Sequence, residues 1–221
     1  MKRFACIAAV CLVATLGFGA SSAQAQTQTA ADPTMYVEFN FGPTLGHKSD
    51  KFFGGEAGLR LTGDIDVFIE ASHMGNVGTT DLDERATIIA NFLGGTAATA
   101  FVANHGAAGL RYNFAATPFP MVHPYVLAGF GIAQVRTEVE FSVNGTPVDP
   151  ASRGVQLGGD LSGTHSKSIL LFGFGVRVPF KTRYFGDLGY RYGQILSKTE
   201  NFETDKSIPT PRVIFGFGIR F

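Results

Sequence analysis

The sequence predicts an all-β fold: an eight-stranded antiparallel β-barrel that spans a membrane, with a short helix in its second extracellular loop. The first observation is the segment Val213 to Phe221, where large apolar residues alternate with mostly glycine or arginine. One face of such a strand suits lipid and the other suits a polar lumen. A soluble strand rarely carries an apolar face to its terminus, because terminal residues tend to fray into water.

The second observation is a five-residue pattern of apolar, glycine, apolar, arginine, apolar that recurs along the chain. Its copies begin at Ala57, Ala108, Phe174, Leu188 and Phe217. In a strand, the glycine and arginine share one face and the apolar residues share the other. A soluble core would bury the row of arginines, which is costly unless each is paired. The repeat therefore favours a crowded polar lumen and a lipid-facing exterior.

The third observation is the composition. The hydrophobic fraction is 45%, which is high for a secreted soluble domain, yet residues 26–221 contain no apolar run of about 20 residues that would form a helical span. Without Lys2 and Arg3, 16 basic residues face 18 acidic ones, a formal charge of −2. This balance gives no support for a nucleic-acid partner. Apolar content spread by alternation is what a barrel needs.

The pattern of the first 25 residues predicts an export signal. Lys2 and Arg3 precede the apolar stretch 4–20, and the small-residue site Ala23-Gln24-Ala25 follows. We expect residues 1–25 to be cleaved after Ala25, residues 26–33 to form a short lead, and residues 34–221 to form the barrel domain. A transmembrane anchor is the alternative, but its apolar run would be short. A lipoprotein signal at Cys11 would leave too little apolar sequence before it.

Both cysteines, Cys6 and Cys11, lie in this predicted signal, so we expect a mature chain without cysteine. Such a chain has no disulfide, no thiol nucleophile and no zinc–thiolate site.

The predicted strands lie near 34–44, 53–62, 65–74, 98–115, 123–139, 168–180, 184–196 and 210–221. Short links alternate with long ones, as expected when tight turns face the periplasm and loops face outside. In the fifth strand the apolar phase shifts between Ile132 and Val135, which we interpret as a β-bulge.

Charged residues in the inward phase predict a network inside the barrel. Two antiparallel strands joined by a tight turn pair residues that are equally distant from the turn. The turn near Thr182 therefore sets Arg177 opposite Asp187. Reflection about Gly63 sets Arg60 opposite Asp66, and the closing strands are expected to bring Arg220 towards Glu38. An eight-stranded barrel has room only for side chains, so this network would plug the lumen and exclude a wide pore. Its predicted members are Glu38, Glu56, Arg60, Asp66, Glu70, Arg111, Arg177, Asp187, Arg191 and Arg220.

Aromatic residues cluster near the predicted periplasmic turns, where they would form one interfacial girdle. They are Tyr112, Phe114, Phe180, Tyr184 and Phe221.

The two longest loops, 75–97 and 140–167, are candidates for binding a surface ligand. Residues 81–94 predict a short helix with Asp81 as its cap. Its apolar stripe, Ile88, Ile89, Phe92 and Leu93, either packs on the barrel mouth or on lipid headgroups, or it is a docking surface for a partner. Asn144-Gly145 is a hairpin signal, so the flanking strands are expected to extend above the membrane.

Three segments carry a resemblance to a known family: 109–114, 123–131 and 187–192, the last reading Asp-Leu-Gly-Tyr-Arg-Tyr. They resemble the small outer-membrane β-barrel family of Gram-negative bacteria, the opacity-protein and OmpA-like transmembrane group of the porin family. The resemblance implies a location in the bacterial outer membrane, among its lipid and lipopolysaccharide. Phe221 resembles the family's signal to the barrel assembly machinery. Unlike full OmpA-type proteins, the sequence stops at its last strand, and no peptidoglycan-binding domain is expected.

Three functions remain open. The first is a structural or surface-interaction role, in envelope integrity or adhesion. The second is a narrow ion or solute channel, if the arginine–acid pairs exchange partners. The third, lipid A modification, would need a nucleophile beside a general base, and the five histidines are scattered: His47, His73, His105, His123 and His165. We expect no enzyme activity, no cofactor and no metal site, since no H-E-x-x-H, phosphate or calcium loop is present.

Overall fold

The computed structural model describes residues 35–114, 121–158, 161–196 and 207–221. The predicted signal, its cleavage after Ala25 and the lead 26–33 lie outside the described residues. Pro33–Phe221 forms a compact unit of its own.

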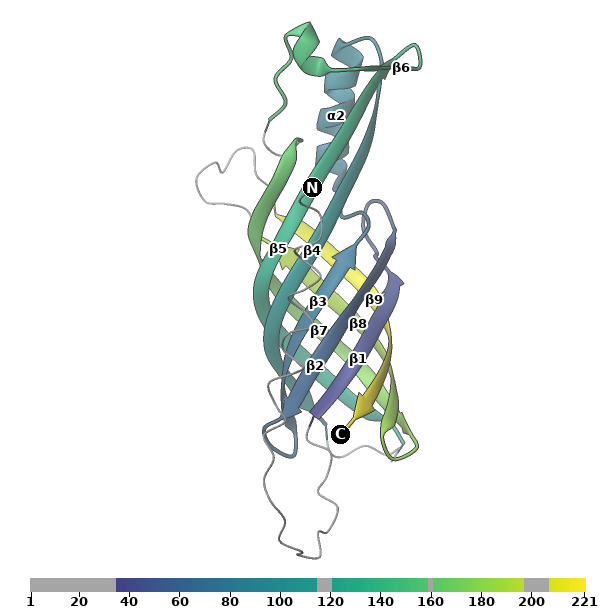
Figure 1. The fold of residues 1–221 in the computed structure, drawn as a ribbon, viewed down its shortest axis with the longest axis vertical. Helices are drawn as coiled ribbons and strands as arrows, with labels where there is room; N and C mark the ends of the chain where they lie inside the picture. The colour runs from purple at the N-terminus through teal and green to yellow at the C-terminus, as the bar shows by residue number, and fades with distance from the viewer. Residues whose placement is uncertain (1–34, 115–120, 159–160, 197–206) are drawn as a thin grey trace, which may run out of the picture. The chain divides into compact units, whose positions relative to one another are not determined.

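Eight strands close into an antiparallel barrel, which confirms the predicted fold class (Figure 1). Neighbours along the chain pair with each other, and β1 pairs with β9 to complete the ring. The strands are β1 (Met35–Pro43), β2 (Lys51–Arg60), β3 (Ile65–Met74), β4 (Thr96–Asn113), β5 (His123–Val143), β7 (Gly163–Phe180), β8 (Tyr184–Ile195) and β9 (Ile208–Arg220).

The tight turns lie at one end of the barrel, which corresponds to the periplasmic end expected from the sequence, because outer-membrane barrels have short periplasmic turns and long outer loops. One turn, Lys181 to Arg183, joins β7 to β8. The aromatic residues predicted to lie near these turns do face outward at this end. The rings of Phe180 and Tyr184 stack at 6.4 Å, and both contact Phe217. Outward aromatic rings at this height suit the lipid–water interface.

Strands β4, β5 and β7 continue beyond the other strands at the outer end (Figure 1). Strand β3 ends at Met74, opposite Ala103, while β4 remains paired with β5 as far as Thr96. Asn144 and Gly145 adopt positive φ angles of 52° and 77°, the geometry of a hairpin turn that favours Asn-Gly. This turn joins β5 to the short strand β6 (Thr146–Val148), and the helical turn η2 (Pro150–Arg153) follows.

The predicted loop helix is α2 (Thr80–Phe92), and it packs mainly on β4. The prediction that Asp81 caps it is wrong: the cap residue is Thr79, which makes no side-chain cap bond. Asp81 lies inside the first turn, where a carboxylate still complements the helix dipole. The described residues contain no helix long and apolar enough to cross a membrane.

The apolar stripe of the helix is divided between two environments. Ile89 and Leu93 pack against a small core with Phe141 of β5, whereas Ile88 and Phe92 are 66% and 79% exposed.

The predicted β-bulge in β5 is wrong. The pairing of β5 with β4 runs unbroken from Tyr125 to Ser142, and its pairing with β7 is equally regular. Ile132 faces outward at 63% exposure and Val135 faces inward at 4%, in one continuous alternation. What changes along the strand is the polarity of its outward face, which is apolar up to Ile132 and polar above it, whereas inward residues such as Leu127 and Val135 belong to one apolar cluster.

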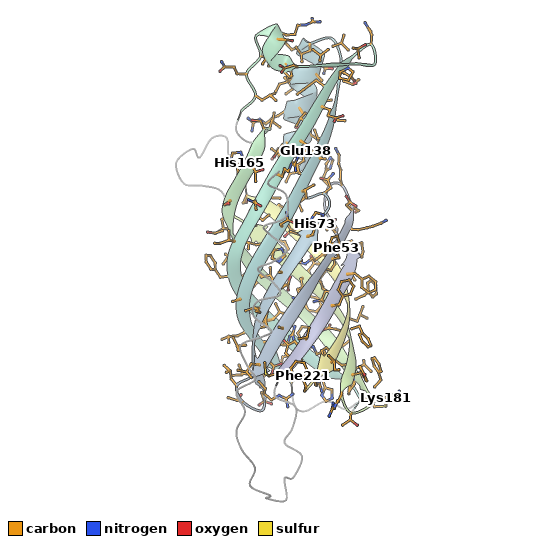
Figure 2. The ribbon with its side chains drawn as sticks, in the orientation of Figure 1. Phe53, His73, Glu138, His165, Lys181 and Phe221 are labelled. Carbon is orange, nitrogen blue, oxygen red and sulfur yellow. The ribbon has the colours of Figure 1, made fainter. Side chains whose placement is uncertain are left out.

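A row of polar residues marks this change on the outer surface. His73, Asn104, Gln134 and Ser166 face outward and are paired in register across β3, β4, β5 and β7. Below the row the outward residues of β5 are apolar, as in Phe130 and Ile132, and above it they are Arg136, Glu138 and Glu140. Figure 2 shows His73 near the outer end of β3 and Glu138 farther along β5. We place the outer edge of the lipid-facing band at this row, because the apolar exterior ends there.

Candidate functional site

The periplasmic half of the lumen holds a network of buried charges, which we call the lower lumen. Its side chains come from β1, β2, β3, β4, β7, β8 and β9, because alternate residues of every strand point inward. Its fully packed members are Glu38, Glu56, Asp66, Glu70, Arg111, Arg177, Asp187, Arg191 and Arg212.

Glu56 is the hub of the network. Arg111 Nη2 lies 2.7 Å from its Oε1, and Arg191 Nη2 donates to its Oε2 at 2.7 Å. Arg177 Nη2 donates to Oε1 at 3.2 Å. The hydroxyl of Tyr36 donates to the same oxygen at 2.6 Å. Three guanidinium groups therefore share one carboxylate, and burial of such charges is stable only when they stay paired.

Arg177 extends the network towards the periplasm. Its Nη2 donates to Glu38, and its Nε donates to Asp187 Oδ2 at 3.1 Å, so Arg177 and Asp187 are in contact in the register that the turn predicts. Tyr125 donates its hydroxyl hydrogen to Asp187 Oδ1 at 2.8 Å. The guanidinium also lies 4.2 Å above the ring of Tyr36, a cation–π contact that offsets part of the lost hydration.

Glu70 extends the network in the opposite direction. It contacts Arg191 and accepts from Arg212 Nη2 at 2.6 Å, and it lies 3.1 Å from His105 Nε2. Arg212 also lies 5.5 Å from the centre of the Phe52 ring and approaches the sulfur of Met74. The charged layer ends at Arg212, where apolar side chains begin.

The remaining two predicted members lie at the periplasmic mouth. Arg60 is paired in register with Asp66, with 3.8 Å between Arg60 Nε and Asp66 Oδ1. The expected approach of Arg220 to Glu38 does not occur. The register of β1 and β9 sets Gly218 opposite Glu38 and Arg220 opposite Tyr36. The Arg220 guanidinium lies 5.0 Å from the ring centre of Phe185.

Above Arg212 the lumen is filled by apolar side chains, a layer that we call the upper lumen. These side chains pack into one hydrophobic cluster and are almost fully buried. They include Met74, Phe101, Ala103, Ala133, Val135, Ile169, Leu171, Ile195 and Ile208. The described lumen thus contains two successive layers of side chains, paired charges near the periplasm and apolar side chains near the outer end.

Sequence reasoning missed several buried partners: Tyr36, His105, Tyr125 and Arg212. Arg212 shares the inward phase of Gly216 and Gly218 in β9, so the alternation of that strand contains the signal. It stands outside the glycine–arginine repeat, because Thr210 occupies the position two residues before it where the repeat has glycine.

A serine, a histidine and a carboxylate do meet inside the barrel. Ser72 Oγ lies 3.0 Å from His105 Nδ1, and His105 Nε2 faces Glu70. All three are buried, and Arg212 Nη2 lies 3.4 Å from the same imidazole nitrogen. A nucleophile needs access to a substrate, so this arrangement suits a packing role. In the described residues no cluster of three or more histidine, cysteine or acidic side chains is arranged to hold a metal.

A second polar cluster lies outside the barrel, where loop 45–50 meets α2. Lys48 Nζ lies 2.8 Å from Asp83 Oδ2 and donates to Thr99 at 2.7 Å. His47 Nε2 lies 3.0 Å from Asp83 Oδ2. Burial by itself would raise the pKa of the Asp83 carboxyl, but hydrogen bonds from Lys48 and Thr99 outweigh it and hold the pKa below its ordinary value. The cluster fastens the start of α2 to the first loop.

Comparisons with known proteins agree with this architecture. A family model described as outer membrane protein beta-barrel domain matches residues 11–221. Neisserial surface protein A has a similar solved structure, with 19% identity, a TM-score of 0.52, and coverage of 85% of this chain and 97% of that one. OprG from Pseudomonas aeruginosa matches with 10% identity, a TM-score of 0.49, and coverage of 86% and 97%. No curated protein sequence matches.

Proposed function

Since the chain belongs to the outer membrane protein β-barrel family and lies in the bacterial outer membrane, we propose that it is a closed barrel with a structural or surface-interaction role. The observation that carries this proposal is that side chains fill both the lower lumen and the upper lumen. It favours envelope integrity or adhesion over conduction.

The two layers resist ion passage for different reasons. A path through the lower lumen would separate Glu56 from the arginines that surround it, and each would then be a buried charge without a partner. A path through the upper lumen would require water among side chains such as Phe101 and Ile169, which are completely buried. Apolar constrictions exclude ions by staying dry.

The surface for interaction is the outer extension formed by the loops 75–97 and 140–167. Strands β4 and β5 raise it beyond the lipid-facing band, and α2 presents Ile88 and Phe92 to the surroundings. Lipid and lipopolysaccharide surround the barrel in this proposal, and Phe221 is the residue that the barrel assembly machinery would recognise. A catalytic role is not proposed, because the buried Ser72–His105 contact has no open side.

Single-channel recording tests the closed barrel. Residues 26–221 are refolded, inserted into a planar bilayer and recorded at symmetric salt. We expect a folded barrel without discrete current steps. Reproducible steps would overturn the closed barrel. If Asp187→Lys then changed their conductance or selectivity, the molecule would be a narrow channel with its gate at the Arg177–Asp187 pair.

A matched pair of variants tests the surface role in cells. The first, I88S/F92S, changes two exposed side chains of α2, and the second, I132S/F130S, changes two lipid-facing side chains of β5. A gene deletion is complemented with each, and adherence to epithelial cells and resistance to detergent are measured at equal surface expression. We expect the α2 variant to lose adherence while it keeps detergent resistance. Unchanged adherence would remove α2 as the contact surface.

A further inference from the structure

The turn between β7 and β8 presents two exposed cations at the periplasmic end of the barrel. The side chains of Lys181 and Arg183 are exposed, and Thr182 lies between them. Within the described part of the chain, neither cation makes an ion pair with a carboxylate. Exposed cations beside a membrane attract the anions of the lipid surface. The turn is therefore a candidate surface for binding an anion.

The carboxylates at this end of the barrel are engaged or lie elsewhere. Asp66 and Asp187 are buried in the lower lumen, where arginines pair with them. The terminal carboxylate of Phe221 accepts a hydrogen bond from the Met35 N–H of β1 at 3.1 Å. Asp64 belongs to the link between β2 and β3, and strands β1 and β9 separate this link from the turn. The turn therefore keeps a positive charge that no described neighbour balances.

The backbone of the turn also has an uncommon conformation. Lys181 has a φ angle of 68°, in the left-handed region. This region favours glycine, because a Cβ atom crowds the neighbouring carbonyl oxygen. The described residues contain one other such non-glycine residue, Asn144, and asparagine tolerates this region. Lysine therefore occupies a position where glycine would be less strained, and strained residues of this kind cluster at ligand-binding positions.

Aromatic rings lie directly beside the turn. Phe180 ends β7 and Tyr184 begins β8, and the ring of Phe217 lies 5.6 Å and 5.9 Å from their ring centres. All three side chains are exposed on the outer wall of the barrel, and we call them the ring platform. The Arg220 N–H donates to the carbonyl oxygen of Arg183 at 2.7 Å, which fixes the turn to β9 and hence to the platform. Cations beside exposed rings suit the headgroup and the acyl chain of a phospholipid.

We propose that this turn binds one anionic phospholipid of the inner leaflet, with its phosphate between Lys181 and Arg183 and an acyl chain along the ring platform. Ammonium and guanidinium groups both donate charge-assisted hydrogen bonds to phosphate oxygens. A zwitterionic headgroup would place its own cation against these two, so a phospholipid with net negative charge, such as phosphatidylglycerol, fits the turn. The site lies outside the lumen, so it depends neither on the closed barrel nor on adhesion. Figure 2 shows Lys181 at this end of the barrel.

Native mass spectrometry measures the binding directly. Residues 26–221 are refolded in a non-ionic detergent, and short-chain phosphatidylglycerol or phosphatidylcholine is titrated at constant ionic strength. We expect one phosphatidylglycerol to be retained, with an affinity at least tenfold above that of phosphatidylcholine. Amide NMR shifts in the same titration should be largest at residues 181–184. Inorganic phosphate is the third probe, and binding as tight as that of phosphatidylglycerol would overturn a lipid site.

A double variant and a matched control locate the site. Lys181→Gln with Arg183→Gln should weaken phosphatidylglycerol binding at least tenfold. Lys51→Gln with Arg153→Gln removes the same two residue types, which are exposed at the outer end, and should leave binding unchanged. Equal affinity for the two lipids, or unchanged affinity in the first double variant, would overturn the proposal.

Lys181→Gly separates lipid binding from a structural role. Glycine relieves the strained backbone, so unfolding in phosphatidylcholine vesicles should require more urea, while the affinity for phosphatidylglycerol falls. A variant that lost stability and lipid binding together would show that the lysine is structural and would contradict the proposal.

Discussion

The two halves of β5 obey one alternation and meet opposite environments. Below Ile132 its outward residues are apolar and face lipid, and the lumen beside it holds paired charges. Above Gln134 its outward residues are charged, and Val135 and Phe141 face an apolar interior. One continuous strand therefore has a lower segment typical of a membrane β-barrel and an upper segment typical of a soluble β-sheet. Polarity of a face depends on the surrounding solvent, whereas the period of two depends on the backbone alone.

The halves also differ in what stabilises their interiors. The lower lumen depends on complete pairing, because each buried charge is costly once its partner is lost. The upper lumen depends on close packing, where the loss of a methylene group costs much less. The following substitutions test this difference, in order from the largest expected effect to the smallest.

The largest effect is expected from Glu56→Gln. Three arginines lose their shared counter-charge, and we expect a loss of about 3–5 kcal/mol in the free energy of unfolding. Urea unfolding in lipid vesicles measures it. The control is Glu138→Gln, in a pair whose side chains are 62% and 50% exposed, with an expected loss of about 0–1 kcal/mol. Equal losses would show that the lower network is not a buried charge system.

Arginine placed on the outward face of β5 should report the surrounding solvent. Phe130→Arg sets a charge in the lipid-facing band, and we expect a cost of about 2–4 kcal/mol. Glu140→Arg, on the same face above the polar row, should cost close to nothing, because water surrounds it. The same urea measurement compares them. A cost for Glu140→Arg similar to that of Phe130→Arg would move the membrane boundary outward.

A single methylene group distinguishes packing from lipid contact. Ile169 is fully buried in the upper lumen, so Ile169→Val should cost about 0.5–1.5 kcal/mol. Ile132→Val removes the same group from a side chain that faces lipid, which fills the space, and should be nearly neutral. Reversal of this order would argue against a packed upper lumen.

The smallest effect concerns the cluster that fastens α2 to loop 45–50. The folded-state pKa of Asp83 lies below its ordinary value of about 4. Its contribution is therefore complete above the unfolded-state pKa and is lost as the pH falls through the folded-state pKa. We expect a distance between spin labels at Leu45 and Thr87 to widen or broaden only in acid below about pH 4. Asp83→Asn should show the acid behaviour already at neutral pH, and a distance in that variant identical to the parent would count against the contact.

The sequence contained enough information to predict the register of strands joined by a tight turn, but not the register of strands that are far apart in the chain. Arg177 and Asp187 flank a tight turn, so reflection about the turn sets their pairing. Strands β1 and β9 are joined by no turn. Their register depends on the stagger of the whole barrel, and the expected Arg220–Glu38 approach missed by two residues.

The errors in β5 and α2 have a similar origin. A β-bulge and a change of solvent both reverse the apolar phase of a strand, and the sequence of Ile132 to Val135 does not separate them. The fastening of α2 depends on Lys48 and Thr99, which are distant in sequence from Asp83. The buried role of Arg212 follows from the inward phase of β9, but its partner Glu70 lies across the lumen.

The central claim is that β5 passes from lipid into water at the row through Gln134 without a break in its alternation. Because the predicted mature chain has no cysteine, single cysteines at each position from 126 to 142 can carry a spin label without background. Collision rates with oxygen and with a water-soluble nickel complex are then measured in vesicles. We expect even positions from 126 to 132 to favour oxygen, even positions from 134 to 142 to favour nickel, and odd positions to be protected from both. A switch of the protected positions from odd to even near residue 134 would restore the bulge and contradict the claim.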